Sequence, residues 1–385
     1  METCALQELP DILTEQILES LPIRDLVRTS VLSTAWRERW KTIPCLVFDE
    51  RYTNVAGIVD KILAQHTGPI QSFKLRFLYL NKANVSGWIN ILKEKGIKNL
   101  SIEMVTGLPG FLNESVFACD KLEVLKLRLC LLHPPRSYNN FAHLKDLHLD
   151  EVNITEEEFR ELASKCPALE KLTLINVDME SLQLSNNPKL KYLHIQGSFH
   201  EFDFENLQEV KFFLLHLFYM IENVDRFWQR STCYLSTVFA TLTGIEKLEL
   251  WSDSTKFFSI GYVPMKLPFM LNSLKEMFLG MDFTDLEGIA VALALLRSSP
   301  NLETLRIGES LPIQNHSSIN SYEFWEKQYR EDTNLECLKF VVMGEIYPVV
   351  TNLSKFTGYI RKCAPALQRV DFIWMSEASA IVFES

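Results

Sequence analysis

The sequence predicts a mixed α/β protein, in which a small helical module at the amino end precedes a long solenoid of stacked strand and helix repeats. Two observations predict this fold class. Between residues 9 and 40 the apolar residues recur three and four positions apart, which is typical of short amphipathic helices. From residue 70 onward a phrase of the form apolar-x-x-apolar-x-apolar returns along the chain. Because each repeat buries only one side of its strand and helix, we expect parallel strands on the concave side and helices outside.

Composition limits the class of protein. The 385 residues are 47% hydrophobic and 23% charged, so we expect the chain to bury a large core. A formal net charge of −10 disfavours binding to nucleic acid or to anionic membranes, because both reward a basic surface. The longest apolar run, residues 212–221, is too short to cross a bilayer, which needs about 20 residues.

The amino end and the cysteines indicate the compartment. The first ten residues lack the basic start and the apolar run of a signal peptide. The eight cysteines show neither paired spacing nor a C-x-x-C, so they are expected to be reduced thiols. We therefore expect the protein in the cytoplasm, the nucleus or both.

Three short helices are expected in the amino-terminal module. The first covers residues 9–21. Asp25 is predicted to cap the second helix and Ser33 the third, in which Trp36 and Trp40 lie one turn apart. A unit of this size has too little interior to bury all of its apolar side chains. Part of its surface is therefore expected to be covered by a partner.

Residues 9–40 also carry a motif in fixed order: Leu-Pro, Ile-Leu, Leu-Pro, Asp-Leu-Val-Arg-Thr-Ser-Val-Leu-Ser, Trp-Arg and Trp. This order resembles the F-box of plant F-box and leucine-rich-repeat proteins. The resemblance implies that the module docks on a Skp-type adaptor and through it joins a cullin-based ubiquitin ligase. Carried over position by position, it implies adaptor contact, or direct support of that contact, at ten residues. They are Leu9, Pro10, Ile12, Leu13, Ile17, Leu18, Leu21, Val31, Leu32 and Trp36.

Two alternatives for the module stay open at this point. Its apolar residues could form only a private core, or its helices could be a helix-turn-helix unit that places Arg37 and Arg39 on DNA phosphates. Phosphate binding needs a net basic face, and five acidic residues nearby argue against it. They are Glu8, Asp11, Glu15, Glu19 and Glu38.

The repeat phrase begins strongly at residues 122, 144, 169, 190, 207, 245, 274, 302, 335 and 367, with weaker copies at 70 and 97. Its first spacings fall within the roughly 20 to 29 residues of a leucine-rich repeat. In two of these copies, the residues that the phrase assigns to the interior are Leu207, Val210, Phe212, Leu335, Leu338 and Phe340.

Helix signals separate the repeats. Thr155 and Glu158 form a capping box, and residues 54–65, 285–296 and 352–361 have helical patterns. We divide the chain into an F-box at residues 1–50, a leucine-rich-repeat solenoid at 51–334, and carboxy-terminal repeats or a cap at 335–385. The last segment resembles the FBD region that closes many plant F-box and leucine-rich-repeat proteins.

The sequence contains no catalytic motif. G-x-S-x-G, G-x-x-x-x-G-K, G-x-G-x-x-G and H-E-x-x-H are all absent, so we expect a non-catalytic protein without a cofactor or a metal. His148 and His194 occupy equivalent variable positions of two strands, where surface histidines are favoured over a metal pair.

The variable strand positions are expected to form the concave wall, and outward aromatic residues there have no core reason to be present. We predict that a target protein binds across the central and carboxy-terminal repeats. The alternative is that these aromatic residues fold under their own long loops. The residues predicted to bind the target are Tyr192, His194, Phe213, Trp251, Phe278 and Arg306.

These expectations favour a substrate-recognition subunit of a Skp-cullin-F-box ubiquitin ligase. The module would hold the adaptor, and the repeats would hold an unknown target protein for ubiquitination and proteasomal degradation. The alternative is an F-box-containing interaction scaffold that does not act in ubiquitin ligation. Neither nucleic acid nor a membrane is expected as a partner.

Overall fold

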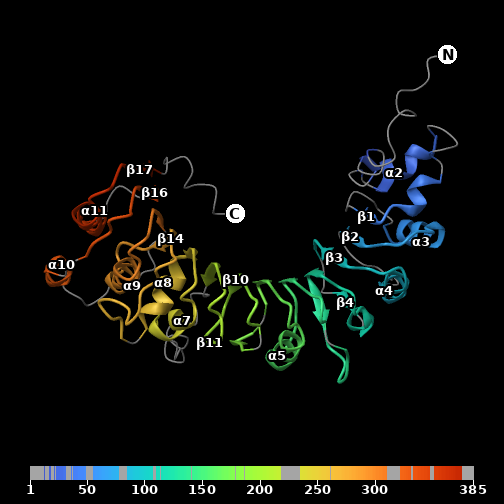
Figure 1. Ribbon diagram of the computed structural model, residues 1–385, viewed down its shortest axis with the longest axis horizontal. Helices are drawn as coiled ribbons and strands as arrows, with labels where there is room; N and C mark the ends of the chain where they lie inside the picture. Colours follow the sequence, from blue (N-terminus) through green and yellow to red (C-terminus); the bar gives the residue numbers. More distant parts are fainter. Residues whose placement is uncertain are drawn as a thin grey trace, which may run out of the picture. The chain divides into compact units, whose positions relative to one another are not determined.

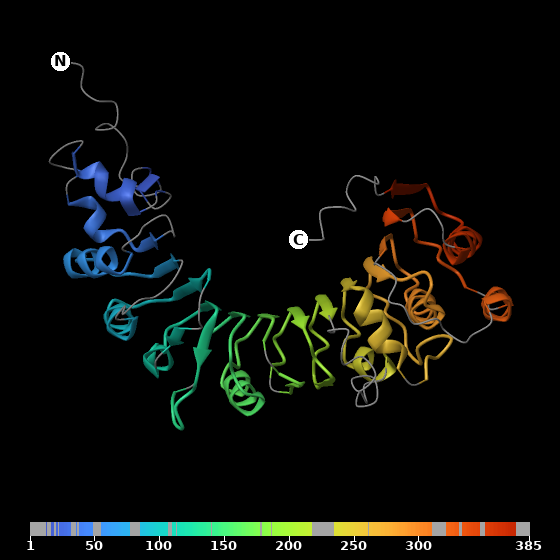
Figure 2. The same cartoon turned by 180° about the vertical axis from the view of Figure 1, so that it is seen from behind.

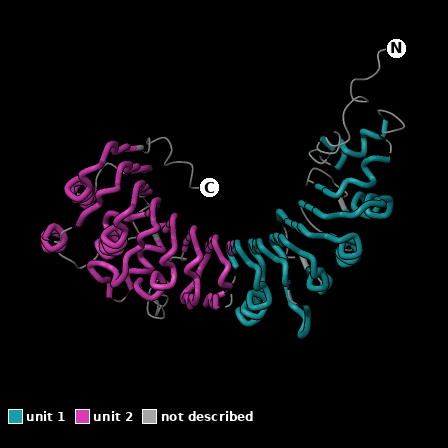
Figure 3. The backbone as a smooth tube through the Cα atoms, in the orientation of Figure 1, with its two compact units in different colours: residues 1–172, 176–178 teal, residues 173–175, 179–385 magenta. Residues whose placement is uncertain are grey.

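The structure is a computed structural model that describes residues 13, 17–18, 21, 23–31, 36, 38–48, 55–77, 85–106, 110–112, 114–139, 141–177, 179–185, 187–217, 235–260, 262–309, 321–330, 333–346 and 351–374. The chain forms two compact units (Figure 3). Unit 1 holds residues 1–172 and 176–178, and unit 2 holds residues 173–175 and 179–385. One strand, β8 (Lys171–Ile175), is divided between them.

Unit 1 begins with short helices and continues as strands separated by helices. Its described elements are α2 (Ile23–Arg28), η2 (Thr29–Val31), η3 (Arg39–Thr42), β1 (Cys45–Phe48), α3 (Val55–Gln65), β2 (Ser72–Phe77), α4 (Val85–Glu94), β3 (Asn99–Met104), β4 (Gly110–Leu112), η4 (Glu114–Ala118), β5 (Val124–Arg128), β6 (Cys130–Leu132), β7 (Asp146–Asp150) and α5 (Glu156–Ser164).

The main sheet of unit 1 is parallel, with the strand order β1-β2-β3-β5-β7. The leucines of the repeat phrase meet across it, because Leu125 is in register with Leu100 on one side and with Leu147 on the other. All three are buried. Helices α3, α4 and α5 all lie on one side of the sheet (Figures 1 and 2). Because the leucines are buried, we infer that they point to this helical side. β4 and β6 form a separate parallel pair.

Unit 2 continues the same alternation of strands and helices. Its described elements are β9 (Ser181–Leu184), β10 (Tyr192–Gly197), β11 (Glu201–Phe204), β12 (Phe212–Leu217), α7 (Leu235–Thr241), β13 (Lys247–Leu250), α8 (Ser252–Ser259), β14 (Glu276–Met281), α9 (Leu286–Arg297), β15 (Thr304–Glu309), α10 (Ser321–Arg330), β16 (Phe340–Ile346), α11 (Thr351–Cys363) and β17 (Arg369–Trp374).

The main sheet of unit 2 is also parallel, with the order β10-β12-β13-β14-β15-β16-β17. Helices α7, α9 and α11 lie on one side of these strands (Figure 1). β9 and β11 form a parallel pair whose Phe202 and Phe204 face the core, where their rings contact Phe257 and Phe213. In each unit we call the side of the sheet that carries no helix its open face.

The helices between the strands largely confirm the sequence predictions. Thr155 and Glu158 form the predicted capping box at the start of α5, and the helices predicted at 54–65, 285–296 and 352–361 are α3, α9 and α11. The prediction for Asp25 was wrong. α2 begins at Ile23, so Asp25 lies in its first turn, where a negative charge is still favourable next to the helix N-terminus.

The carboxy-terminal helices are joined to the repeats by one buried cation. Arg297, at the end of α9, donates from Nε to the Tyr359 hydroxyl of α11 at 3.0 Å and from Nη2 to the Gln328 carbonyl of α10 at 3.3 Å. Its Nη1 donates to the Met265 carbonyl at 3.1 Å. The Thr333 hydroxyl lies 3.2 Å from Nε as well, so four carbonyl or hydroxyl acceptors take the place of a carboxylate and fix α9, α10 and α11 to one another.

The strand register corrects the repeat phrase in two copies. Phe213, not Phe212, is in register with the buried Leu193, and Val341, not Phe340, is in register with the buried Leu305. The interior residues of these repeats lie three positions later than the phrase placed them. They are Val210, Phe213 and Leu215, and Leu338, Val341 and Met343. The prediction that Phe213 faces a target was therefore wrong, since alternation turns it toward the core.

Three strands end in the same unusual backbone conformation. Leu129, Glu151 and Asn176, which directly follow β5, β7 and β8, have φ values of 53°, 51° and 51°. Asparagine adopts this left-handed region more readily than leucine or glutamate does. At Leu129 and Glu151 the local residue type therefore does not account for this conformation.

The corrected register makes a prediction about stability. Phe213→Ala should lower the free energy of unfolding by about 3 to 5 kcal/mol, because it empties a site in which only 1% of the side chain is exposed. Phe212→Ala, at the half-exposed neighbouring position, is the matched control and should cost far less. Urea denaturation of both variants gives the comparison. A larger loss of stability in Phe212→Ala than in Phe213→Ala would support the register that the repeat phrase first predicted.

Candidate functional site

Apolar side chains of the amino-terminal module are open to solvent. Leu13 is 46% exposed, Ile17 is 40% exposed and Val31 is 85% exposed. Leu13 and Ile17 are both helical and lie four positions apart in the sequence. Large exposed apolar side chains in so short a stretch of chain are typical of a surface that a partner protein covers.

The module also has an interior of its own. Leu18 and Trp36, which the motif places at the adaptor contact, are buried, and Leu21 is half-buried. Ile23 and Leu26 of α2 are buried as well, and α2 contacts β1. Buried residues of this kind support a contact surface from behind. Four predicted contact residues lie outside the described residues, and they are Leu9, Pro10, Ile12 and Leu32.

The open face of unit 1 is covered by ion pairs between neighbouring strands. Lys74 of β2 pairs with Glu103 of β3 at 3.3 Å, and Lys126 of β5 pairs with Asp146 of β7 at 3.5 Å. These side chains occupy outward positions of the strands, where the alternation of the repeat phrase places variable residues. The face is therefore hydrophilic but largely neutralised by its own charges.

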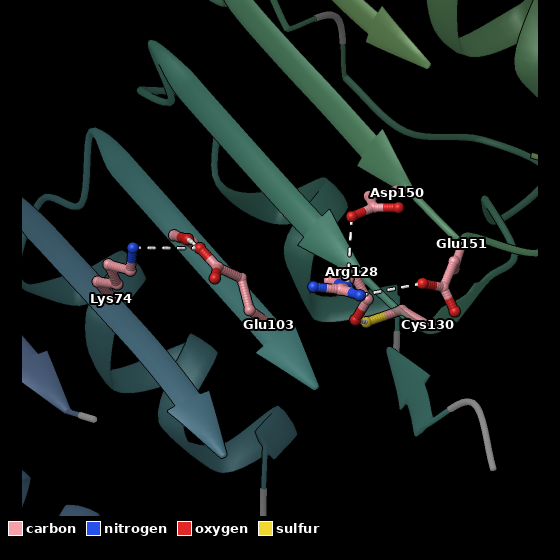
Figure 4. A network of polar contacts seen from close by, with 7 residues as sticks. Lys74, Glu103, Arg128, Cys130, Asp150 and Glu151 are labelled. Carbon is pink, nitrogen blue, oxygen red and sulfur yellow. Dashed lines mark hydrogen bonds and ion pairs between the residues drawn. The ribbon is translucent and has the colours of Figure 1, made fainter. Parts of the chain in front are cut away.

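Arg128, at the end of β5, joins two carboxylates (Figure 4). Its Nε lies 3.3 Å from Asp150 Oδ2, and its Nη2 donates to Glu151 Oε1 at 3.1 Å. The contact with Asp150 lacks hydrogen-bond alignment, so the attraction there is Coulombic. The hydrogen bond from Arg128 to Glu151 raises the pKa of the guanidinium, whereas burial raises the pKa of Asp150.

A hollow of about 500 Å³ lies over these strands. His148 of β7 lines it, and burial lowers the pKa of that imidazole, with the positive charge of Lys126 lowering it further. Each of the three cations that line the hollow, Lys74, Lys126 and Arg128, has a carboxylate partner within 3.5 Å. In the described part of unit 1 this hollow therefore offers no cation that lacks an acidic partner.

The open face of unit 2 is aromatic. Tyr192 of β10 stacks on Phe212 of β12, with ring centroids 4.5 Å apart and planes 4° from parallel. Trp251 follows β13 and its backbone N–H donates to the Leu215 carbonyl, which extends the strand pairing and turns the indole onto the open face. The indole stacks on His216 at 4.8 Å and contacts Phe278 of β14 at 4.8 Å.

A small pocket lies beside Trp251 and Phe278. Its volume is about 200 Å³, and Arg306 of β15 forms part of its wall. Three of the six residues predicted to bind a target therefore line one pocket. The remaining lining residues are Lys247, Glu249, Glu276, Met277 and Thr304.

The other three predicted residues lie elsewhere in unit 2. Tyr192 belongs to the stacked pair on β10 and β12. His194 is half-buried. Burial lowers the pKa of His216, and the positive charge of His194 lowers it further. Phe213 is in the core. The sequence analysis missed Phe212 and His216, and it would have found both as outward residues had the repeat phrase started at Val210.

Metal and thiol chemistry have little support in the described structure. Among the described residues no group of three or more histidine, cysteine, aspartate or glutamate side chains could hold a metal ion. Burial raises the pKa of the Cys130 and Cys166 thiols to about 12, so both are protonated at neutral pH. Within the same residues, no helix has the length and apolar character needed to span a membrane.

Comparisons with known proteins agree with this geometry. The F-box domain family matches residues 6–48, and the LRR repeats of the FBD-associated F-box protein At5g56370 match residues 85–307. The first match covers the module with the exposed apolar side chains. The second covers most of the strands that carry the ion pairs and the aromatic pocket.

Several whole proteins of Arabidopsis thaliana are similar to this chain. The F-box/FBD/LRR-repeat protein At1g13570 is 32% identical over 95% of this chain and 90% of its own length. The putative F-box/FBD/LRR-repeat protein At4g00315 is 26% identical over 94% of this chain and 90% of its own length. The F-box/FBD/LRR-repeat protein At3g52680 is 36% identical over 46% of this chain.

The half-buried imidazole of His148 makes a prediction about pH. Because burial lowers the pKa of His148, the unfolded chain takes up this proton first as the pH falls through about 6.5. Stability should therefore decrease with falling pH in that range, and His148→Gln should make this decrease smaller. Thermal unfolding between about pH 8 and pH 5.5 measures it, with the exposed His143→Gln as the control. Equal slopes for His148→Gln and the wild type would contradict the prediction.

Proposed function

Because the chain belongs to the family of plant F-box/FBD/LRR-repeat proteins, we propose that it is the substrate-recognition subunit of a Skp-cullin-F-box ubiquitin ligase. In this proposal the F-box binds a Skp-type adaptor, which in turn joins a cullin. The repeats recruit a target protein for ubiquitination and proteasomal degradation. We propose that the protein carries out this function in the cytoplasm, the nucleus or both.

One observation carries the adaptor half of the proposal. The F-box has a packed interior at Leu18, Leu26 and Trp36, and yet it leaves Leu13, Ile17 and Val31 exposed. A module that served only its own core would have no reason to expose these side chains. Fully burying a large apolar side chain contributes about 1.5 to 3 kcal/mol, so covering the exposed parts of these three side chains contributes a share of that for each.

The target half rests on the open face of unit 2. Aromatic side chains that have stacked partners but remain accessible are rigid, and rigid aromatic anchors dominate many protein interfaces. Trp251 meets this description, because His216 and Phe278 both contact its indole and 40% of the side chain is exposed. The chain itself supplies no chemistry in this proposal. Covalent linkage of the two binding surfaces raises the local concentration of the target at the ligase.

A scaffold that carries an F-box but takes no part in ubiquitin ligation is the second candidate. Such a scaffold would use the same exposed residues of the repeats to bind a target, but it would not bind the adaptor. Reconstitution with a Skp-type adaptor, a cullin and a conjugating enzyme separates the two. Adaptor binding followed by ubiquitin transfer to a bound target supports the ligase, whereas target binding without adaptor binding supports the scaffold.

The exposed F-box residues make a prediction about adaptor binding. The triple variant Leu13→Ala, Ile17→Ala, Val31→Ala should weaken binding to a purified Skp-type adaptor by about a hundredfold, because it removes the apolar anchors of the proposed contact and truncating an anchor costs about 1 kcal/mol or more. Its unfolding midpoint should stay close to that of the wild type, because the three side chains are exposed. Titration calorimetry gives the affinity.

A matched control removes exposed apolar surface elsewhere. Tyr262 and Tyr322 are 77% and 71% exposed in unit 2, so Tyr262→Ala with Tyr322→Ala should leave adaptor affinity unchanged. Wild-type affinity in the triple variant would show that the adaptor surface had been assigned to the wrong residues.

The aromatic pocket makes a prediction about target capture. Trp251→Ala with Phe278→Ala should lose target proteins while retaining the adaptor, because neither residue lies in the F-box. Proximity labelling in plant cells under proteasome inhibition, with tagged wild type and variant, measures the difference. Tyr322→Ala serves as the control. Identical sets of labelled proteins for wild type and variant would show that targets bind to a surface other than this pocket.

A further inference from the structure

Three glycines form a strip across the open face of unit 2. Gly280 of β14 is in register with Gly308 of β15, and Gly308 is in register with Gly344 of β16. Each lies two residues after an outward position, so side-chain alternation places all three on the open face. Three neighbouring strands therefore lack side chains at one level, which we call the glycine strip. Gly308 and Gly344 are half-buried, whereas Gly280 is buried. Glycine at such places permits close approach of another backbone.

The glycine strip adjoins the aromatic pocket. A Cβ atom added at Gly308 would lie 3.1 Å from Cζ of Phe278, so the Phe278 ring leans over the strip. At Gly344 the nearest atom to an added Cβ is the Ile307 carbonyl oxygen at 3.9 Å, so the space there is open. The pocket of about 200 Å³ is smaller than the roughly 300 to 1,000 Å³ that holds a small-molecule ligand. It suits one large side chain.

The rim of the pocket carries one cation without a partner. Arg306 is exposed, and its neighbours in register are the uncharged Phe278 and Val342. Among the described residues it makes no ion pair. The pocket's other cation, Lys247, is paired with Glu249 at 2.8 Å. An exposed guanidinium flanked by apolar side chains favours a ligand that brings a carboxylate.

We propose that this site binds a short extended segment of a target protein that combines an aromatic or large aliphatic side chain with a nearby carboxylate. The apolar side chain enters the pocket against Trp251 and Phe278, and the carboxylate pairs with Arg306. The backbone of the segment passes over the accessible part of the glycine strip, Gly308 and Gly344. The inference rests on the proposed function, because it names the class of segment that the receptor recognises.

The anion is a carboxylate and not a phosphate for an electrostatic reason. Glu249 and Glu276 also line the pocket, and Glu249 is already neutralised by Lys247. A dianionic phosphate would meet stronger repulsion from Glu276 than a monoanionic carboxylate does. The two anions give different outcomes in the experiment below.

The test selects a phage-displayed library of random unmodified peptides on the purified full-length chain. Peptides with an aromatic or large aliphatic residue and an aspartate or glutamate within two positions of it should be enriched. Their affinity should fall about tenfold or more in Trp251→Ala and in Gly344→Leu, which fills open space on the strip. Gly344→Ala, which adds only the tolerated Cβ, provides a milder variant if the leucine perturbs folding.

Reversing the charge of Arg306 tests the proposal in a way that a damaged fold could not reproduce. Selection on Arg306→Glu should replace the acidic preference with a preference for lysine or arginine beside the same apolar residue. Arg361→Glu, an exposed position on α11, is the matched control and should keep the acidic preference. The Arg306 assignment fails if the acidic preference survives in Arg306→Glu.

Three other results would overturn the proposal. They are no enrichment on the wild-type chain, peptide binding that Trp251→Ala and Gly344→Leu leave unchanged, and tighter binding when the acidic residue is replaced by phosphoserine in a synthetic peptide. Adaptor binding is measured on the same preparations. Because it uses the F-box alone, a failure of peptide selection leaves the proposed function intact, whereas a failure of adaptor binding contradicts that function directly.

Discussion

The dependence of each repeat on its neighbours governs this structure. A strand such as β5 has two buried leucines, Leu125 and Leu127, and they are covered only because β3 and β7 place leucine and isoleucine beside them. The same backbone bonds recur between successive repeats, as when the Asp146 N–H donates to the Glu123 carbonyl at 3.1 Å. Inward positions must therefore stay apolar, while outward positions, held about 5 Å from those of the next strand, are free to carry binding chemistry.

The two open faces use that freedom differently. In unit 1 the outward residues neutralise one another in pairs, as Lys74 and Glu103 do. In unit 2 they are rings in contact with one another, with Arg306 at the edge of their pocket. Stacked rings lose little rotamer freedom when a ligand arrives, because their neighbours already hold them. Rings held in this way would suit the role of binding anchors that we propose for them.

Much of the fold could be predicted from the sequence, since inward leucines recur at regular spacing and the Thr155 capping box is a purely local signal. The errors at Leu207 and Leu335 have one cause. In both stretches an apolar residue stands three positions before the true repeat, so two overlapping phrases fit equally well and only pairing with neighbouring strands decides between them. The site was harder to predict for the same reason. Trp251 and Phe278 could be named as outward aromatics, but the glycine strip depends on cross-strand register.

The ion pairs of unit 1 have a consequence for selectivity. A charged polymer that approaches Arg128 must compete with Asp150 and Glu151, which already form ion pairs with it, and must lose its own hydration while doing so. The net gain from such an exchange is small. We therefore expect this part of the surface to attract highly charged molecules of either sign only weakly.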